Sequence, residues 1–124
     1  MARVLVVDDH ESVRQMLRQA LETAGMAVCA AADGEKALDL FRREPVDVVV
    51  TDIVMPNKEG IETIVELRRL SPRLKIIAMS GRDTSEFLGM ALKLGADHTL
   101  QKPFEMRDLV SLVRACLGPD SSAA

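Results

Sequence analysis

Five short apolar runs alternate with amphipathic stretches along this 124-residue chain, and this alternation limits the folds open to it. Residues 3–7, 48–50 and 76–79 are nearly continuous apolar runs rich in β-branched residues, which is typical of strands buried on both faces of a parallel sheet. Residues 26–31 and 98–101 are weaker strand candidates. The pattern therefore predicts five parallel strands.

The stretches between these runs carry apolar residues at helical spacing, and Gly or Pro residues mark where most of them end. Each stretch therefore predicts a helix with one face toward the core. The expected core-facing positions are Val13, Leu17, Ala20, Leu21 and Ala24 in the first helix, Ala37, Leu38 and Phe41 in the second, Ile61, Ile64 and Val65 in the third, Phe87, Leu88, Ala91 and Leu92 in the fourth, and Leu109, Leu112, Val113 and Cys116 in the fifth.

A strand–helix unit repeated five times predicts an α/β fold, because right-handed crossovers place helices on both faces of a parallel sheet. We expect a doubly wound five-stranded parallel sheet in the flavodoxin-like order 2-1-3-4-5, with five helices. One domain is expected over residues 1–118. Residues 119–124 are expected to be a flexible tail or the start of a linker.

Composition argues against several functions. The net charge of −3 is too small to indicate a nucleic-acid or membrane surface, and no apolar run reaches the length of a membrane span. Cys29 and Cys116 lie far apart among apolar neighbours, so we expect reduced thiols in a cytoplasmic protein, with redox sensing as the alternative. His10 and His98 have no cysteine at ligand spacing, which argues against a zinc site.

Polar residues that can carry chemistry follow the expected strands at one edge of the sheet. Asp8 and Asp9 follow the first strand, Asp52 the third, Ser80 the fourth and Lys102 the fifth. In the expected order, ligands bind between the first and third strands, so three carboxylates should meet there. Crowded carboxylates need a cation, or some of them must stay protonated, and Mg²⁺ favours one or two carboxylates together with a phosphate. The set predicts Mg²⁺-assisted phosphoryl transfer to a carboxylate.

Four motifs in this order and spacing resemble the receiver domains of two-component response regulators, over residues 3–117. They are Asp8-Asp9 after the first strand, Asp52 in TDIVMP, Met79-Ser80-Gly81, and Lys102-Pro103-Phe104.

The resemblance implies a role for each site residue. Asp52 would be the phosphoacceptor, Asp9 a direct Mg²⁺ ligand, Asp8 a ligand through a bound water, and Val54 a ligand through its backbone carbonyl. It also implies that Ser80 hydrogen-bonds one phosphoryl oxygen, that Lys102 pairs with another, and that the Lys102–Pro103 peptide bond is cis.

One position departs from the family pattern. Receiver domains usually carry an aromatic residue three positions before the lysine, and Thr99 stands there, preceded by His98. We expect intact phosphorylation chemistry with an altered readout through a switch region of Ser80, Gly81, His98, Thr99 and Phe104.

The resemblance also implies partners. A histidine kinase or histidine phosphotransfer protein would donate the phosphoryl group, and a downstream protein or a linked output domain outside these residues would read it. The surface of the fourth and fifth helices is the expected output face and a candidate homodimer face. We expect no direct contact with nucleic acid or membrane, and self-phosphorylation and autodephosphorylation rather than enzymatic turnover.

Alternative functions remain open. A receiver-shaped interaction module that is never phosphorylated is the main one. A nucleotide- or flavin-binding module is disfavoured, because the turn after the first strand is acidic and lacks glycine-rich spacing. An aspartate-based phosphatase is also disfavoured, because Val54 stands where a general acid is needed. The basic residues Arg68, Arg69, Arg73 and Lys75 are expected to form a solvated face.

Overall fold

Strands and helices alternate along the chain in the computed structural model, which describes residues 1–54, 60–81 and 86–123, with side chains as far as Gly118. The elements are β1 (Arg3–Val7), α1 (Glu11–Thr23), β2 (Ala27–Ala31), α2 (Gly34–Arg43), β3 (Val48–Asp52), α3 (Gly60–Leu70), β4 (Lys75–Ser80), α4 (Phe87–Leu94), β5 (His98–Gln101) and α5 (Met106–Ala123).

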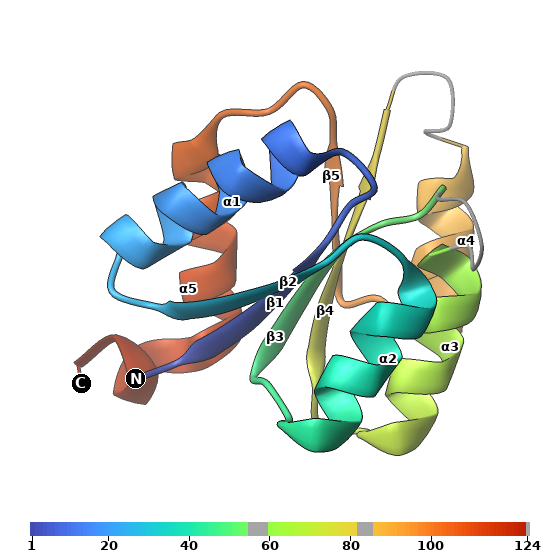
Figure 1. Ribbon diagram of the computed structural model, residues 1–124, viewed down its shortest axis with the longest axis horizontal. Coiled ribbons are helices and arrows are strands. Elements are labelled where there is room, and N and C mark those ends of the chain that lie inside the picture. The colour runs from blue at the N-terminus through green and yellow to red at the C-terminus, as the bar shows by residue number, and fades with distance from the viewer. Residues whose placement is uncertain (55–59, 82–85, 124) are drawn as a thin grey trace.

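The five strands form one sheet in the order β2-β1-β3-β4-β5, and each neighbouring pair is parallel. This confirms the doubly wound α/β fold and the strand order predicted from the sequence. β1 lies between β2 and β3, so the two strands that carry the acidic residues are neighbours. β2 and β5 are the edge strands (Figure 1).

Helices cover both faces of the sheet, with α1 and α5 on one side and α2, α3 and α4 on the other (Figure 1). Val4 and Val6 pack on the α1–α5 side, whereas Leu5 and Val7 pack on the opposite side. Successive residues of a strand point to opposite faces, so a strand covered on both faces needs apolar residues at every position. Burial on both faces therefore explains the continuous apolar runs in the sequence.

The predicted helix stripes are largely confirmed in α1, α2 and α5, where Leu17, Leu21, Phe41, Leu109 and Val113 are buried. The remaining stripe residues of these three helices are buried or half-buried. These helices are amphipathic, so the spacing of their apolar residues identifies the face that packs on the sheet.

The expectation for α4 was wrong at two positions. Phe87 and Leu92 are 36% and 47% exposed, and Ala91 is the buried residue of this helix. Met90 and Leu94 are also exposed, at 49% and 41%. Because apolar residues lie on nearly all sides of α4, their spacing could not indicate which side faces the core.

Arg68 does not belong to a solvated face, contrary to expectation. Its guanidinium donates hydrogen bonds to the backbone carbonyls of Gly95 at 2.6 Å and Pro72 at 2.9 Å, and it pairs with Asp97 at 2.8 Å. Arg69 is exposed, as the sequence suggested. Arg68 therefore fastens the end of α3 to the turn between α4 and β5.

The C-terminal element runs to Ala123, but the backbone at Gly118 is non-helical, with φ 80° and ψ 171°. The break lies where the fifth helix was expected to end. The domain boundary at residue 118 and the flexible tail stay predictions. Within the described residues, none of the helices combines the length and apolarity needed to cross a bilayer.

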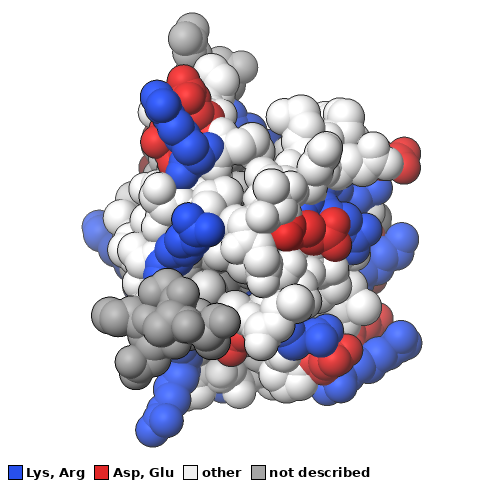
Figure 2. All heavy atoms as spheres, turned by 90° about the vertical axis from the view of Figure 1, so that its left-hand side faces the viewer, with Lys and Arg blue, Asp and Glu red and all other residues white. Residues whose placement is uncertain are grey.

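Charges of both signs are scattered among uncharged residues on the side of the molecule that carries α1 and α5 (Figure 2). Cys29 and Cys116 are free thiols and half-buried. Burial raises the pKa of both thiols above the ordinary cysteine value.

Candidate functional site

The sheet brings the predicted site residues to one edge. Asp8 follows β1, Asp52 ends β3 and Ser80 ends β4, and the strands are parallel, so their carboxyl ends lie together. The backbone N–H of Lys102 donates to the Ser80 carbonyl at 2.7 Å, which holds the residue after β5 beside the end of β4. The Lys102–Pro103 peptide bond is cis, as predicted.

Lys102 joins the two buried carboxylates. Its Nζ lies 2.8 Å from Asp8 Oδ2 and 3.2 Å from Asp52 Oδ2. The Asp8 side chain is fully buried, that of Asp52 is 11% exposed, and that of Lys102 is 26% exposed. Asp8, Asp52 and Lys102, which are far apart in the sequence, therefore form one charged cluster that opens to solvent on the lysine side.

The backbone after β3 folds back on Asp52. The Val54 N–H donates to Asp52 Oδ1 at 3.2 Å, so each oxygen of this carboxylate has a donor. The Thr51 hydroxyl donates to the Asp52 backbone carbonyl at 2.9 Å. These contacts fix the carboxylate with one oxygen toward Lys102 and the other toward the chain that continues from β3.

Gly60 is a positioning residue that sequence reasoning missed. A Cβ atom on Gly60 would overlap the Asp52 carbonyl oxygen and lie 2.5 Å from Ile53 Cα, so no side chain fits there. The Gly60 N–H donates to the Ile53 carbonyl at 3.1 Å. The only signal in the sequence was a glycine at the start of a helical pattern, a position that glycine also occupies without such a contact.

The charged groups in the cluster shift one another's pKa values. Burial by itself would raise the pKa of Asp8, but hydrogen bonds from Lys102 and the His10 N–H outweigh it, so the pKa lies below the ordinary value. Burial raises the pKa of Asp52, and Lys102 offsets this only in part. Burial would lower the pKa of Lys102, yet the two carboxylates raise it, so the ammonium stays charged.

Asp9 and His10 complete the cluster on its outer side. One carboxylate oxygen from each of Asp8 and Asp9 and one ring nitrogen of His10 lie within 4.8 Å of one another. His10 Nδ1 lies 3.2 Å from Asp8 Oδ1 and 3.1 Å from Asp9 Oδ1, although its ring is 68% exposed. His10 therefore lies at the rim of the cluster, in contact with both carboxylates.

The donor set fits a divalent cation. Asp9 Oδ1 is shielded from solvent and, although it lies 3.1 Å from His10 Nδ1, it accepts no hydrogen bond within the described part of the chain. A shielded carboxylate oxygen without a donor is costly unless a cation compensates it. The neighbouring donors are carboxylate oxygens, which are the ligands that Mg²⁺ prefers. Asp8 and Asp9 could therefore hold Mg²⁺ beside Asp52.

The residues of the expected switch region lie in different surroundings. Ser80 is fully buried and its hydroxyl donates to the Gly81 carbonyl at 3.0 Å. Thr99 is half-buried on β5, His98 is exposed, and Phe104 packs against the core on the α1–α5 side. Arg82, which flanks the site in sequence, lies outside the described residues.

Comparison with known proteins gives one consistent family. A family model described as the response regulator receiver domain matches residues 4–114. The response regulator MprA of Mycobacterium sp. (strain KMS) is 40% identical over 128 aligned positions, which cover 98% of this chain and 56% of that protein. The chain thus spans about half the length of the curated relatives it matches.

Solved structures give the same result. A response regulator receiver domain protein from Clostridium thermocellum superposes with a TM-score of 0.91 at 27% identity and covers all of both chains. The chemotaxis response regulator CheY4 of Vibrio cholerae superposes with a TM-score of 0.85 at 34% identity, covering 94% of this chain and 98% of that one.

Proposed function

The chain belongs to the response regulator receiver domain family, and from that premise we propose that Asp52 accepts a phosphoryl group from the phosphohistidine of a partner protein. The donor is a histidine kinase or a histidine phosphotransfer protein of a two-component system. The acyl phosphate on Asp52 then changes a protein-interaction surface and is lost by hydrolysis.

The transfer exchanges one bond to phosphorus for another. A carboxylate oxygen of Asp52 attacks phosphorus, the bond from phosphorus to the imidazole nitrogen of the donor breaks, and that nitrogen keeps the electron pair. In the return step water attacks phosphorus and the bond to Asp52 breaks, which gives inorganic phosphate and restores the carboxylate. The domain changes only itself, so it is not a turnover enzyme.

The residues around Asp52 supply the charge that this step needs. Lys102 Nζ, 3.2 Å from Asp52 Oδ2, would pair with a phosphoryl oxygen once the carboxylate is esterified. The Ser80 hydroxyl would leave the Gly81 carbonyl and donate to a second oxygen. Asp9 would ligate Mg²⁺ directly, Asp8 through water, and Asp52 and the Val54 carbonyl would add ligands. Bound Mg²⁺ would neutralise charge on the phosphoryl group.

The single observation that supports this function most strongly is the position of Lys102 between Asp8 and Asp52. A cation held between two buried carboxylates from different strands needs three loops to converge. The pKa of Asp8 below its ordinary value keeps that carboxylate ionised and able to hold a metal ion.

Labelling with acetyl phosphate tests the proposal. Wild type incubated with acetyl phosphate and Mg²⁺ should gain one phosphate by mass spectrometry, and Asp52→Asn should gain none. Hydroxylamine should remove the label, because it cleaves acyl phosphates. Equal labelling of both proteins would move the acceptor elsewhere. Absence of label in wild type, with or without a cognate kinase, would favour an interaction module that is not regulated by phosphorylation.

The proposed output surface is the face of α4, β5 and α5. Phe87, Met90, Leu92 and Leu94 are exposed on α4, and large exposed apolar residues on one helix are typical of a protein-binding surface. A partner protein, a linked output domain or a second copy of the chain would cover them. Thr99, half-buried on β5, would link this face to the site without the ring movement usual in the family.

A further inference from the structure

The outer edge of the sheet at β2 offers unused backbone groups. The Ala27 N–H donates to the Ala2 carbonyl and the Ala31 carbonyl accepts from the Asp8 N–H, so these residues face β1. Alternate residues of a strand direct their N–H and C=O to opposite sides. Ala30 therefore presents both groups outward, and neither makes a hydrogen bond within the ranges that the structure describes.

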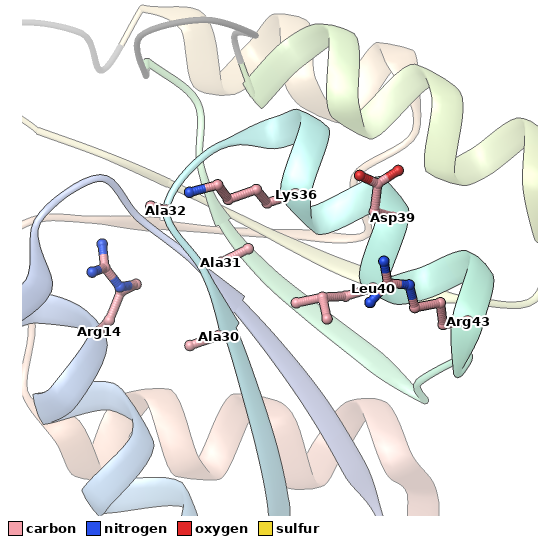
Figure 3. Close-up of a pocket in the computed structure, with 8 residues that line it drawn as sticks. All are labelled: Arg14, Ala30, Ala31, Ala32, Lys36, Asp39, Leu40 and Arg43. Carbon is pink, nitrogen blue, oxygen red and sulfur yellow. The ribbon is translucent and has the colours of Figure 1, made fainter.

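A hollow of about 390 Å³ lies along this edge between α1 and α2. Residues 30–32, all alanine, form the strand side of this hollow, and Leu40 of α2 lines it from the helix side (Figure 3). Arg14 of α1 borders it on one side, and Lys36 and Arg43 of α2 border it on the other. An approaching chain would find a free strand edge at the bottom of a groove.

The rim of this groove is basic, although the chain as a whole carries a net charge of −3. A smaller adjoining hollow shares Arg14 and adds Arg18. Lys36 and Arg43 make no ion pair with any residue that the structure describes. The acidic residues that line the two hollows are Asp39 and Glu11, so basic residues exceed acidic ones.

Arg18 limits how far along the strand the free edge extends. Its Nη2 lies 3.3 Å from the Val28 carbonyl, the other outward-facing acceptor of β2. Covering an edge with a charged side chain is a common protection against unwanted strand pairing. The opening therefore centres on Ala30, at the end of β2 next to Ala31 and Ala32.

From these features we propose that the β2 edge binds an extended acidic segment of a partner protein, which adds to the sheet as a sixth strand beside Ala30. Main-chain hydrogen bonds to the Ala30 N–H and C=O supply the pairing, as in other strand-addition complexes. Lys36 and Arg43 on one side and Arg14 and Arg18 on the other attract acidic side chains of the segment. This surface shares no lining residue with the charged cluster of Asp8, Asp52 and Lys102, although it adjoins that cluster where Arg14 Nη1 donates to the Asp8 carbonyl at 2.8 Å.

A labelled peptide of about seven residues, matched to the usual length of a strand, tests the proposal. Glutamate alternates with threonine in this probe, and fluorescence anisotropy measures its binding to the full chain. We expect saturable binding that weakens at least about tenfold in Lys36→Glu/Arg43→Glu, because the two new carboxylates repel the glutamates of the peptide. Amide exchange at Ala30 should slow at least about fivefold in the complex.

Matched probes and variants separate strand addition from simple charge attraction. Lys93→Glu makes the same kind of charge change on α4, outside the groove, and should alter binding by less than about twofold. A peptide with alternate backbone nitrogens methylated keeps its charge but cannot pair fully, and it should bind at least about tenfold more weakly. A lysine–threonine peptide should not bind.

Three outcomes would overturn the proposal. One is equal affinity for the methylated and unmethylated peptides. Another is unchanged Ala30 exchange in a saturated complex, and the third is no peptide binding at millimolar concentration. If single-stranded DNA bound instead and Arg43→Glu weakened it, the groove would belong to a nucleic-acid partner. Circular dichroism of each variant checks that loss of binding does not reflect unfolding.

Discussion

Gly60 packs on the backbone of Asp52 so closely that a Cβ atom at Gly60 would overlap the Asp52 carbonyl oxygen. Gly60 begins α3, and Asp52 ends β3. The contact ties the first turn of the helix to the end of the strand that carries the proposed phosphoacceptor. The position of Asp52 thus depends on a residue that has no side chain.

Substituting Gly60 by alanine tests this dependence. The added methyl group forces the Asp52–Ile53 backbone and the start of α3 apart, and overpacking of this kind costs about 1–3 kcal/mol. We expect the free energy of unfolding in urea to fall by that amount. We also expect slower acetyl phosphate labelling of Asp52, because its carboxylate moves relative to Lys102.

Gly89→Ala is the matched control. A Cβ atom on Gly89 would have nothing within 4 Å, and the residue lies within α4. Alanine favours a helix interior over glycine by about 0.5–1 kcal/mol, so this variant should be slightly stabilised and label normally. If Gly60→Ala behaved like Gly89→Ala in both measurements, the proposed positioning role would be wrong.

The raised pKa of Asp52 predicts how its removal changes stability with pH. Burial favours the protonated carboxyl, so the folded chain keeps a proton that the unfolded chain has released. The ionised group therefore costs stability above its folded-state pKa, and this cost vanishes below the unfolded-state pKa of about 3.9. In EDTA, Asp52→Asn should therefore be more stable than wild type at pH 7.

Urea unfolding across the acid range checks this sign. The difference between Asp52→Asn and wild type should shrink as the pH falls toward the ordinary aspartate pKa, because wild type then becomes neutral at this position. An Asp52→Asn variant that was less stable than wild type at pH 7 in EDTA would show that the Lys102 contact outweighs the cost of burial.

Lys102→Met should destabilise the metal-free protein, because the buried carboxylates then lack a neighbouring positive charge. Asp8 is fully buried and loses its cationic partner, so the metal-free protein should lose about 2–4 kcal/mol. Mg²⁺ should raise the melting temperature of this variant more than that of wild type, because a metal ion would replace the missing positive charge. Lys93→Met, on exposed α4, should stay within about 0.5 kcal/mol of wild type.

A melting temperature of Lys102→Met that responded to Mg²⁺ no more than wild type would argue against a metal ion at Asp8 and Asp9. Ca²⁺ is a useful comparison, since it also takes oxygen ligands but accepts more of them at longer distances. A larger rise in melting temperature with Ca²⁺ than with Mg²⁺ would indicate that the site exists but prefers Ca²⁺.

The sheet could be predicted from the sequence for a physical reason. A parallel strand buried on both faces must be apolar at successive positions, as Val4, Leu5, Val6 and Val7 are. Charged residues then lie only at the ends of such strands, so Asp8 stands out directly after β1. The carboxylates and the lysine of the site were predictable because parallel strands end at one edge.

Other features depend on contacts that no local pattern records. The apolar residues of α4 surround the helix, so nothing in their spacing separated buried Ala91 from exposed Leu92. Gly60 is required by the path of another segment, the backbone at Asp52. The basic residues from Arg68 to Lys75 look alike in sequence, and only the fold places the Arg68 side chain against the turn after α3 and the turn between α4 and β5.

The planar guanidinium of Arg68 makes several contacts at once that a lysine ammonium cannot reproduce. The guanidinium donates to the carbonyls of Gly95 and Pro72 and pairs with Asp97, which in turn accepts the Ile76 N–H at 2.8 Å. In Arg68→Lys a single ammonium can satisfy only part of this set, so some of these carbonyls, among them the partly buried one of Gly95, lose donors. We expect the free energy of unfolding in urea to fall by about 1–3 kcal/mol.

Arg69→Lys, next to Arg68 and exposed, should change the free energy of unfolding by less than about 0.5 kcal/mol. Acetyl phosphate labelling of Asp52 should be normal in both variants, because Arg68 touches none of the site residues; equal stability of the two variants would show that the Arg68 contacts are dispensable.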